Sequence, residues 1–133
     1  MSVFVDTSAL YAVLDRDDEF HGSARESWIR LLSGGESLVT SNYVVVECFA
    51  LVQGRLGMDA VRVFNDDILP VLSVLWMAEE SHSSAAQAVL AAGRRDLSLV
   101  DCSSFLLMRQ AGIRTAFAFD KHFAEQGFEV QPS

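Results

Sequence analysis

The sequence predicts an α/β fold of three layers, in which helices cover both faces of a mostly parallel sheet. Short apolar segments typical of strands alternate with helical segments along the whole chain. Two of these apolar segments are followed directly by an acid. Asp6 follows VFV at residues 3–5, and Asp120 follows AFAF at residues 116–119. With 133 residues, half of them hydrophobic, the chain is long enough for one core, so we expect a single domain over residues 1–133.

The first half of the chain begins with a predicted strand at residues 3–5 and a helix at 9–14, which Thr7 or Ser8 is placed to start. An acidic turn at 15–19 leads to an amphipathic helix at 21–32, which a glycine pair ends. The side chains of this helix that we expect in the core are Ala24, Trp28, Ile29, Leu31 and Leu32.

The later elements follow from the same patterns of period and capping. The predicted strands cover residues 37–40, 70–76, 115–119 and 128–130. The predicted helices cover residues 43–55, 58–68, 81–92 and 98–110. Trp76, at the end of the third strand, is expected in the core together with Trp28.

Cysteine use and hydropathy restrict the location of the protein. Cys48 and Cys102 are far apart and lie among apolar residues, which favours buried, reduced thiols over a disulfide. No apolar run reaches the length of a membrane span, and strand-like sequence follows Met1 directly. We therefore expect a cytoplasmic protein without a membrane segment.

The formal charge of −8 comes from eighteen acidic and ten basic residues. This balance argues against binding nucleic acid by neutralising phosphates over a broad face. It does not exclude a site where acids hold cations, because two divalent cations would halve the negative charge and present positive charge to a phosphate.

Asp6 and Asp120 are the first candidates for such a site. In open parallel sheets, ligands bind beyond the carboxyl ends of the strands, which is where both acids are predicted to lie. Each has a structural alternative: Asp6 could cap the following helix, and Asp120 could simply form a turn.

Glu47 and Asp101 are the candidates on helices. Glu47 stands in the apolar run VVVECFALV, where a charged side chain needs a partner unless it reaches solvent. Asp101 lies near the start of a buried helix, where Ser98 and Asp101 also fit a capping box. The contributions of Asp96 and His122 remain open, and an exposed position at a helix start is the expected role of His122.

Several carboxylates in one cleft repel each other unless cations hold them ionised. Oxygen ligands without clustered His or Cys suit Mg²⁺ or Mn²⁺ better than Zn²⁺. A cation bound in this way activates water and stabilises the oxygens of a phosphoester, so the pattern indicates phosphoester hydrolysis.

Four segments carry a resemblance to a known family. They are VDTSAL at residues 5–10, TSNYVVVE at 40–47, LSLVDCSSF at 97–105 and AFAFDKHF at 116–123. In this order they resemble the acidic motifs of PIN-domain ribonucleases, and the likeness is greatest to VapC-type toxins of toxin-antitoxin pairs.

The resemblance implies a PIN-like fold and a Mg²⁺- or Mn²⁺-dependent endoribonuclease. The implied catalytic residues are Asp6, Glu47, Asp101 and Asp120, of which Asp6, Asp101 and Asp120 are the implied metal ligands. The polar residues implied to line the site or bind substrate are Thr7, Ser8, Asn42 and Ser103. The family also implies a homodimer that acts on RNA and is inhibited by a small antitoxin protein.

Two other functions remain possible from the sequence. A PIN domain without turnover could serve as an RNA- or partner-binding module. A phosphohydrolase with Asp6 as nucleophile is less favoured, because such enzymes usually carry a second aspartate two positions later, where this chain has Ser8.

Overall fold

The computed structural model describes residues 1–133 and has a five-stranded sheet at its centre. All neighbouring strands are parallel, in the order β3-β2-β1-β4-β5, so that β1 (Ser2–Val5) is the middle strand. The other strands are β2 (Ser37–Ser41), β3 (Ser73–Leu75), β4 (Thr115–Phe117) and β5 (Glu129–Gln131). The predicted parallel α/β architecture is confirmed.

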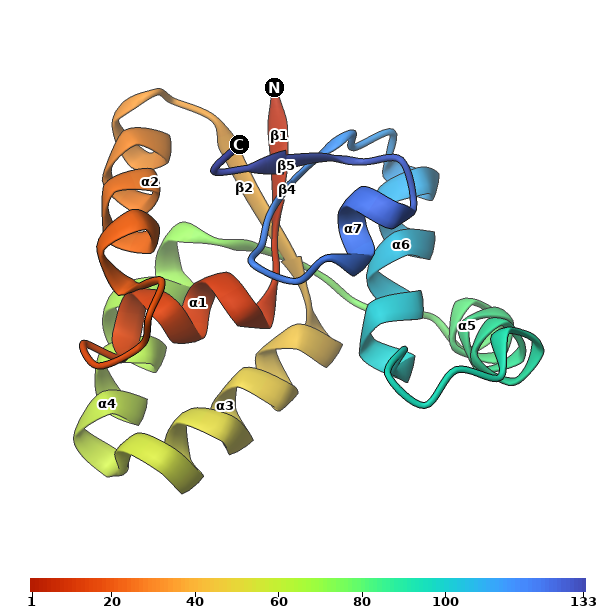
Figure 1. The fold of residues 1–133 in the computed structure, drawn as a ribbon, viewed down its shortest axis with the longest axis horizontal. Helices are drawn as coiled ribbons and strands as arrows, with labels where there is room; N and C mark the ends of the chain where they lie inside the picture. The colour runs from red at the N-terminus through yellow and green to blue at the C-terminus, as the bar shows by residue number, and fades with distance from the viewer.

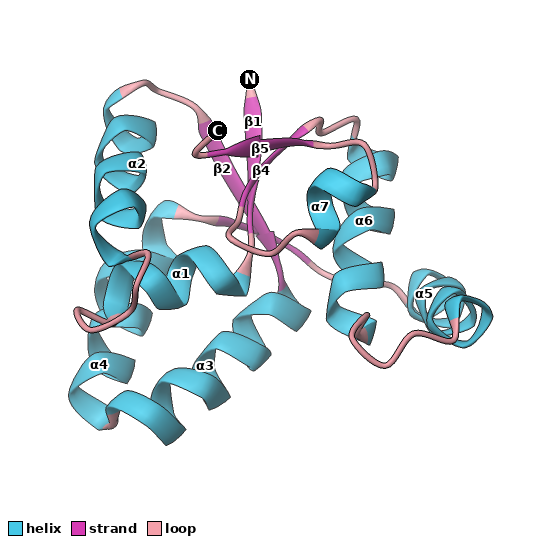
Figure 2. Cartoon of the chain, viewed as in Figure 1, coloured by secondary structure: helices cyan, strands magenta, loops and turns pink.

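Helices cover the sheet on both sides (Figures 1 and 2). They are α1 (Thr7–Leu14), α2 (His21–Ser33), α3 (Asn42–Leu56), α4 (Met58–Val63), α5 (Glu79–Ala92), α6 (Leu99–Ala111) and α7 (His122–Glu125). Helices α1, α2 and α4 lie on one side of the sheet, whereas α6 and α7 lie on the other, with α5 outside α6. None of these helices combines the length and the apolar character that a membrane crossing requires.

The core is built around β1, whose residues Val3, Phe4 and Val5 are fully buried. A continuous apolar run is what a parallel strand covered on both faces requires. Phe123 of α7 packs against Phe4, with ring centroids 6.5 Å apart, and against Phe105 of α6 at 5.1 Å. These aromatic contacts fix α6 and α7 against the sheet.

Because the strands are parallel, their carboxyl ends meet at one edge of the sheet, the lower edge in Figure 1. Helix α1 begins directly after β1, and α3 begins directly after β2. The Asp6 N–H still donates to the Phe117 carbonyl at 3.0 Å, so the chain leaving β1 remains bonded to β4. Asp6, which follows β1, and Asp120, in the loop after β4, are thus brought together.

Two predicted strands are too long. The predicted strand at 70–76 begins only at Ser73, which is opposite Val39, because Pro70 lies in a 3₁₀ turn (Leu69–Val71) and has no N–H for a ladder. The predicted strand at 115–119 ends at Phe117. The Phe119 N–H donates to the Ser8 hydroxyl at 2.9 Å instead of to a strand, and Asp120 therefore lies in a loop.

Three apolar residues predicted to lie in the core do not. Trp76 is 78% exposed, because it follows the last residue of β3 and extends beyond the sheet. Ile29 and Leu32 are also exposed. The face of α2 that is buried carries Ala24, Ser27 and Leu31, and the two exposed side chains lie outside this face.

Other parts of the chain agree with or extend the sequence predictions. The helix predicted at 58–68 is α4 followed by a π-helical turn (Phe64–Ile68). The short helix α7 was not predicted. Cys48 and Cys102 are both buried and unpaired, as expected.

Candidate metal centre

Asp6 is the first residue after β1 and is only 4% exposed. It caps α1, and its Oδ2 accepts hydrogen bonds from the Ser8 backbone N–H at 3.1 Å and the Ser8 hydroxyl at 2.7 Å. Burial raises the pKa of this carboxyl to about 7, although the bonds from Ser8 oppose the rise, and the charges of Asp101 and Asp120 raise it further. Asp6 is therefore both a helix cap and a carboxylate that is poorly stabilised as an anion.

Asp101 is held in the first turn of α6 by a complete capping box. Its Oδ2 accepts the Ser98 N–H at 3.0 Å, and its own N–H donates to the Ser98 hydroxyl at 3.0 Å. Burial raises the pKa of Asp101, and the charge of Asp120 adds to the effect. The capping role considered from the sequence is therefore real, and it coexists with a position among other acids.

Asp120 lies in the loop between β4 and α7 and is partly exposed. Its Oδ1 accepts the backbone N–H of His122 at 2.8 Å. In all three acids, one carboxylate oxygen accepts a hydrogen bond from the protein and the other accepts none. Each acid thus has one oxygen fixed and one available to a ligand.

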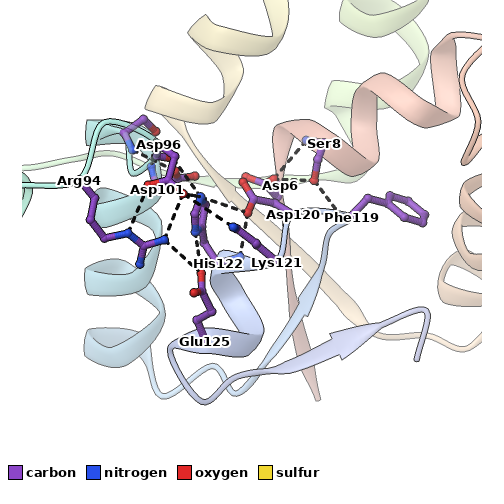
Figure 3. Close-up of polar contacts among 11 residues, drawn as sticks. Asp6, Ser8, Arg94, Asp96, Asp101, Phe119, Asp120, Lys121, His122 and Glu125 are labelled. Atoms are coloured by element: carbon purple, nitrogen blue, oxygen red, sulfur yellow. Dashed lines mark hydrogen bonds and ion pairs between the residues drawn. The ribbon is translucent and has the colours of Figure 1, made fainter. Parts of the chain in front are cut away.

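The structure brings these carboxylates together from β1, α6 and the loop after β4 (Figure 3). Ligand atoms of Asp101, Asp120 and His122 lie within 4.8 Å of one another. No Lys or Arg forms an ion pair with any of the three carboxylates. The His122 ring is the basic group that pairs with one of them, Asp120, at 3.7 Å. Carboxylates this close are poorly stabilised as anions unless a cation joins them.

The donor set fits a hard divalent cation. Buried carboxylate oxygens without thiolates are the ligands of Mg²⁺ and Mn²⁺ in proteins. The Thr7 hydroxyl beside Asp6 is buried without a hydrogen-bond partner, which leaves one more oxygen unsatisfied next to these acids. A cation would offset the burial, and after it the repulsion by Asp101 and Asp120, that raise the pKa of Asp6.

Glu47 lies on α3 and is half-buried, with no hydrogen bond or ion pair. Neither Glu47 nor Asp6 belongs to the group within metal-binding spacing, which is Asp101, Asp120 and His122. Burial raises the pKa of the Cys48 thiol to about 12, and the charges of Glu47 and Asp6 add to this rise. Glu47 and Asp6 are therefore both close to Cys48.

The predicted site-lining residues have different surroundings. Ser8 links Asp6 to the loop of Asp120, because its hydroxyl donates to Asp6 and accepts from Phe119. The Asn42 side chain accepts the Met77 N–H at 2.8 Å and so fixes the chain after β3. The Ser103 hydroxyl is fully buried and donates within α6 to the Val100 carbonyl at 2.8 Å.

His122 differs most from expectation, since it is only 6% exposed and not a solvated helix start. Its ring lies between the Asp96 carbonyl and the Glu125 carboxylate. The sequence reasoning did not identify Glu125, although its spacing of three from His122 on a helix was a usable signal. Asp96 faces Arg94 in a bidentate pair at 3.1 and 3.2 Å.

An α/β sheet with acids converging at the carboxyl ends of its strands defines a class of proteins that bind cations and act on phosphates. Within that class, the chain belongs to the PIN domain family, whose model matches residues 3–129. The family recognised from the four acidic motifs is thereby confirmed.

The curated relatives are of the VapC type. The chain is 34% identical over 132 residues to the 23S rRNA-specific endonuclease VapC20 of Mycobacterium tuberculosis strain H37Rv, covering 98% of each chain. The protein of that name from strain CDC 1551 / Oshkosh matches equally well.

Solved structures give the same result. The crystal structure of Mycobacterium tuberculosis VapC20, described as a Sarcin-Ricin loop cleaving toxin, matches with a TM-score of 0.82 and 31% identity over 95% of both chains. Rickettsia felis VapBC2, bound to promoter DNA, has a TM-score of 0.71 at 12% identity over 98% of both chains. At that identity the likeness shows the fold alone.

Proposed function

We propose that this chain is an endoribonuclease of the VapC type that depends on Mg²⁺ or Mn²⁺. The observation that carries the proposal is the cluster of acids at one sheet edge: Asp101 and Asp120 lie within metal-binding spacing, and their charges, after burial, raise the pKa of Asp6. Membership of the PIN domain family and a relative named as an endonuclease support nuclease activity.

In this proposal Asp6, Asp101 and Asp120 hold the cation through the oxygens that accept no hydrogen bond. When bound, the cation lowers the pKa of a water molecule and stabilises the charge of the phosphate under attack. The Ser8 hydroxyl and the Ser98 and His122 N–H groups keep the other oxygens in place. Glu47 would orient the attacking water, and Thr7, Asn42 and Ser103 would support the site.

The names of the relatives support a proposal for the substrate class. VapC20 is named for 23S rRNA, and the present chain aligns with it over almost its full length. We propose that this chain also cleaves ribosomal RNA, at a site still to be mapped.

The test is cleavage of total cellular RNA by the purified chain, with and without Mg²⁺, next to Asp101→Asn. We expect cleavage at few sites that requires Mg²⁺ and falls by at least about 100-fold in the variant, because a cation ligand is lost. Equal cleavage by the variant would contradict the assignment. RNA binding without any cleavage would favour the alternative, a PIN domain that acts as a binding module.

We also propose a partner of the antitoxin kind, bound to an apolar groove of about 580 Å³ between α2 and α4. Trp28, Ile29, Leu32, Ala60 and Val63 line the groove, and the exposed Arg16 and Arg25 border it. Large exposed apolar surfaces with polar surroundings mark protein interfaces. An amphipathic helix with acidic flanks fits this chemistry.

Leu32→Asp tests this proposal. We expect the variant to cleave RNA normally but to resist inhibition by the small protein encoded next to it, because a charge enters the apolar contact. Leu90→Asp is the matched control, since Leu90 is equally apolar, 80% exposed, and on α5 at the other side of the molecule (Figure 1). Inhibition of Leu32→Asp at wild-type concentrations of the partner would contradict the docking site.

A second copy of the chain is the partner that we propose for the outer face of α3. Val46 there is 68% exposed and borders a shallow apolar hollow with Val45, Phe49 and Ala50. Sedimentation of the purified chain measures this directly: Val46→Asp should shift a dimer to a monomer.

A further inference from the structure

We infer that His122 is a positioning residue of the acidic site and not a ligand of its cation, an inference that rests on the proposed function. Its ring nitrogen lies 3.7 Å from Asp120 and within the metal-binding spacing of Asp101. From spacing alone, His122 would count as a third ligand. Its hydrogen bonds decide against this reading.

The Nε2 atom faces the backbone carbonyl of Asp96 at 2.9 Å. A carbonyl oxygen only accepts hydrogen bonds, so Nε2 carries the proton. A ring nitrogen that donates its proton has no lone pair for a cation. Nδ1 is also engaged, with the Glu125 carboxylate at 2.8 Å, so neither nitrogen is free (Figure 3).

These bonds connect the three segments that carry or flank the acids. The ring joins α7, on which both His122 and Glu125 lie, to the loop before α6 through the Asp96 carbonyl. The backbone N–H of the same residue donates to Asp120 Oδ1 at 2.8 Å. His122 therefore sets the position of Asp120 relative to the start of α6, where Asp101 lies.

The loop that His122 contacts is itself fixed. Arg94 binds both carboxylate oxygens of Asp96 and lies 3.6 Å from Glu125. Arg94 thus restrains the residue whose carbonyl accepts from His122, and Asp96 Oδ2 also lies 3.9 Å from the ring. Groups that orient metal ligands in this indirect way typically change cation affinity by about 10- to 100-fold when they are lost.

The first experiment observes the ring directly, by ¹⁵N–¹H NMR of the full chain labelled on histidine. We expect the Nε2 proton of His122 in the cation-free protein, and we expect it to remain when Mg²⁺ is added to saturation. Loss of this proton on Mg²⁺ binding would show that Nε2 is a ligand and would overturn the inference. This measurement uses the unmodified chain and does not depend on a variant that folds.

The second experiment measures Mg²⁺ affinity by calorimetry. His122→Phe should weaken binding by about 10-fold or more, because the donor to Asp96 is lost. His122→Gln, which can keep an N–H near the position of Nε2, should recover most of that loss. His21→Phe is the matched control: His21 also contacts a backbone carbonyl, that of Ala12 at 2.8 Å, but at the start of α2. We expect it to bind Mg²⁺ as the wild type does.

The outcomes separate this inference from the proposed function. A wild-type chain that binds no Mg²⁺ contradicts both. A wild type that binds Mg²⁺, together with a His122→Phe variant of equal affinity, contradicts the positioning role alone.

Discussion

At the residue scale, the acids of the site depend on neighbours that hold one of their two oxygens. Asp6 depends on Ser8, Asp101 on Ser98, and Asp120 on the His122 backbone. Ser8 supports the site at two points, because its hydroxyl donates to Asp6 and also accepts the Phe119 N–H from the loop of Asp120. One side chain thus connects two of the three proposed ligands.

We predict that Ser8→Ala weakens Mg²⁺ binding by about 10-fold, because Asp6 loses a donor that favours its ionised form. It should also lower the free energy of unfolding by about 1–3 kcal/mol, because the Phe119 N–H loses its acceptor. Calorimetry and urea unfolding measure the two effects.

Ser104→Ala is the control for this variant. Ser104 is fully buried, more so than Ser8, and its hydroxyl donates to the Val100 carbonyl at 2.9 Å, within α6. We expect it to keep the cation affinity of the wild type. An unchanged affinity in Ser8→Ala would show that the serine does not support Asp6.

At the scale of elements, the beginnings of helices matter most for the site. Helix α6 has a complete capping box, in which Asp101 is both cap and candidate ligand. Helix α5 has Ala78 as its N-cap residue and therefore has no side-chain cap. The contrast indicates that the capping of α6 orients Asp101 in addition to stabilising the helix.

We therefore predict two effects for Ser98→Ala. The free energy of unfolding should fall by about 1 kcal/mol, as for the loss of an N-cap. Cleavage of RNA should fall further than this loss of stability explains, because the Asp101 N–H loses its acceptor and only the Ser98 backbone N–H still orients the carboxylate. Both are measured on one preparation, by urea unfolding and by initial cleavage rates in saturating Mg²⁺.

Ala78→Ser gives the reverse comparison. A serine there can cap α5 and should raise the free energy of unfolding by about 0.5–1 kcal/mol without changing cleavage. If Ser98→Ala lost only stability and cleaved at the wild-type rate, the capping box would have no part in the site.

At the scale of the whole molecule, a chain of charge −8 buries two of its acids, Asp6 and Asp101. The pKa of Asp6 is raised to about 7 in the fold from 3.8, and the pKa values of Asp101 and His122 are also raised. In each case the folded state holds the proton more tightly than the unfolded state. Protonation of these groups therefore stabilises the fold fully only below the pKa values that they have in the unfolded chain. This stabilisation is lost as the pH rises through the pKa values of the folded state.

We predict that the cation-free protein is more stable at pH 5 than at pH 8, by at most about 3 kcal/mol from Asp6, because at pH 5 the unfolded carboxyl is already ionised and the folded one still holds its proton. Mg²⁺ should raise the melting temperature at pH 8, where the acids are ionised, and have little effect at pH 5. Thermal unfolding at both pH values, with Mg²⁺ or with a chelator, measures this.

Asp6→Asn provides the comparison for this pH dependence. A neutral amide of the same shape should be more stable than the wild type at pH 8 without Mg²⁺ and should show a smaller response to the cation. A wild-type protein whose cation-free stability rose from pH 5 to pH 8 would contradict the burial of an uncompensated acid.

Much of the fold could be predicted because strand and helix periods are local properties of the sequence. The apolar run at residues 3–5 predicts a buried strand, since parallel strands covered on both faces are apolar at successive positions. The family was also predictable, because the order and spacing of four acidic motifs are properties of the chain itself.

Only the tertiary structure decided how the acids are held. The length of β4 depends on Ser8, which takes the Phe119 N–H and leaves Asp120 in a loop. The burial of His122 depends on a carbonyl 26 residues earlier. The exposure of Trp76 depends on where β3 ends against β2. Each of these contacts joins residues distant in sequence, and local preferences carry no information about such contacts until the chain has folded.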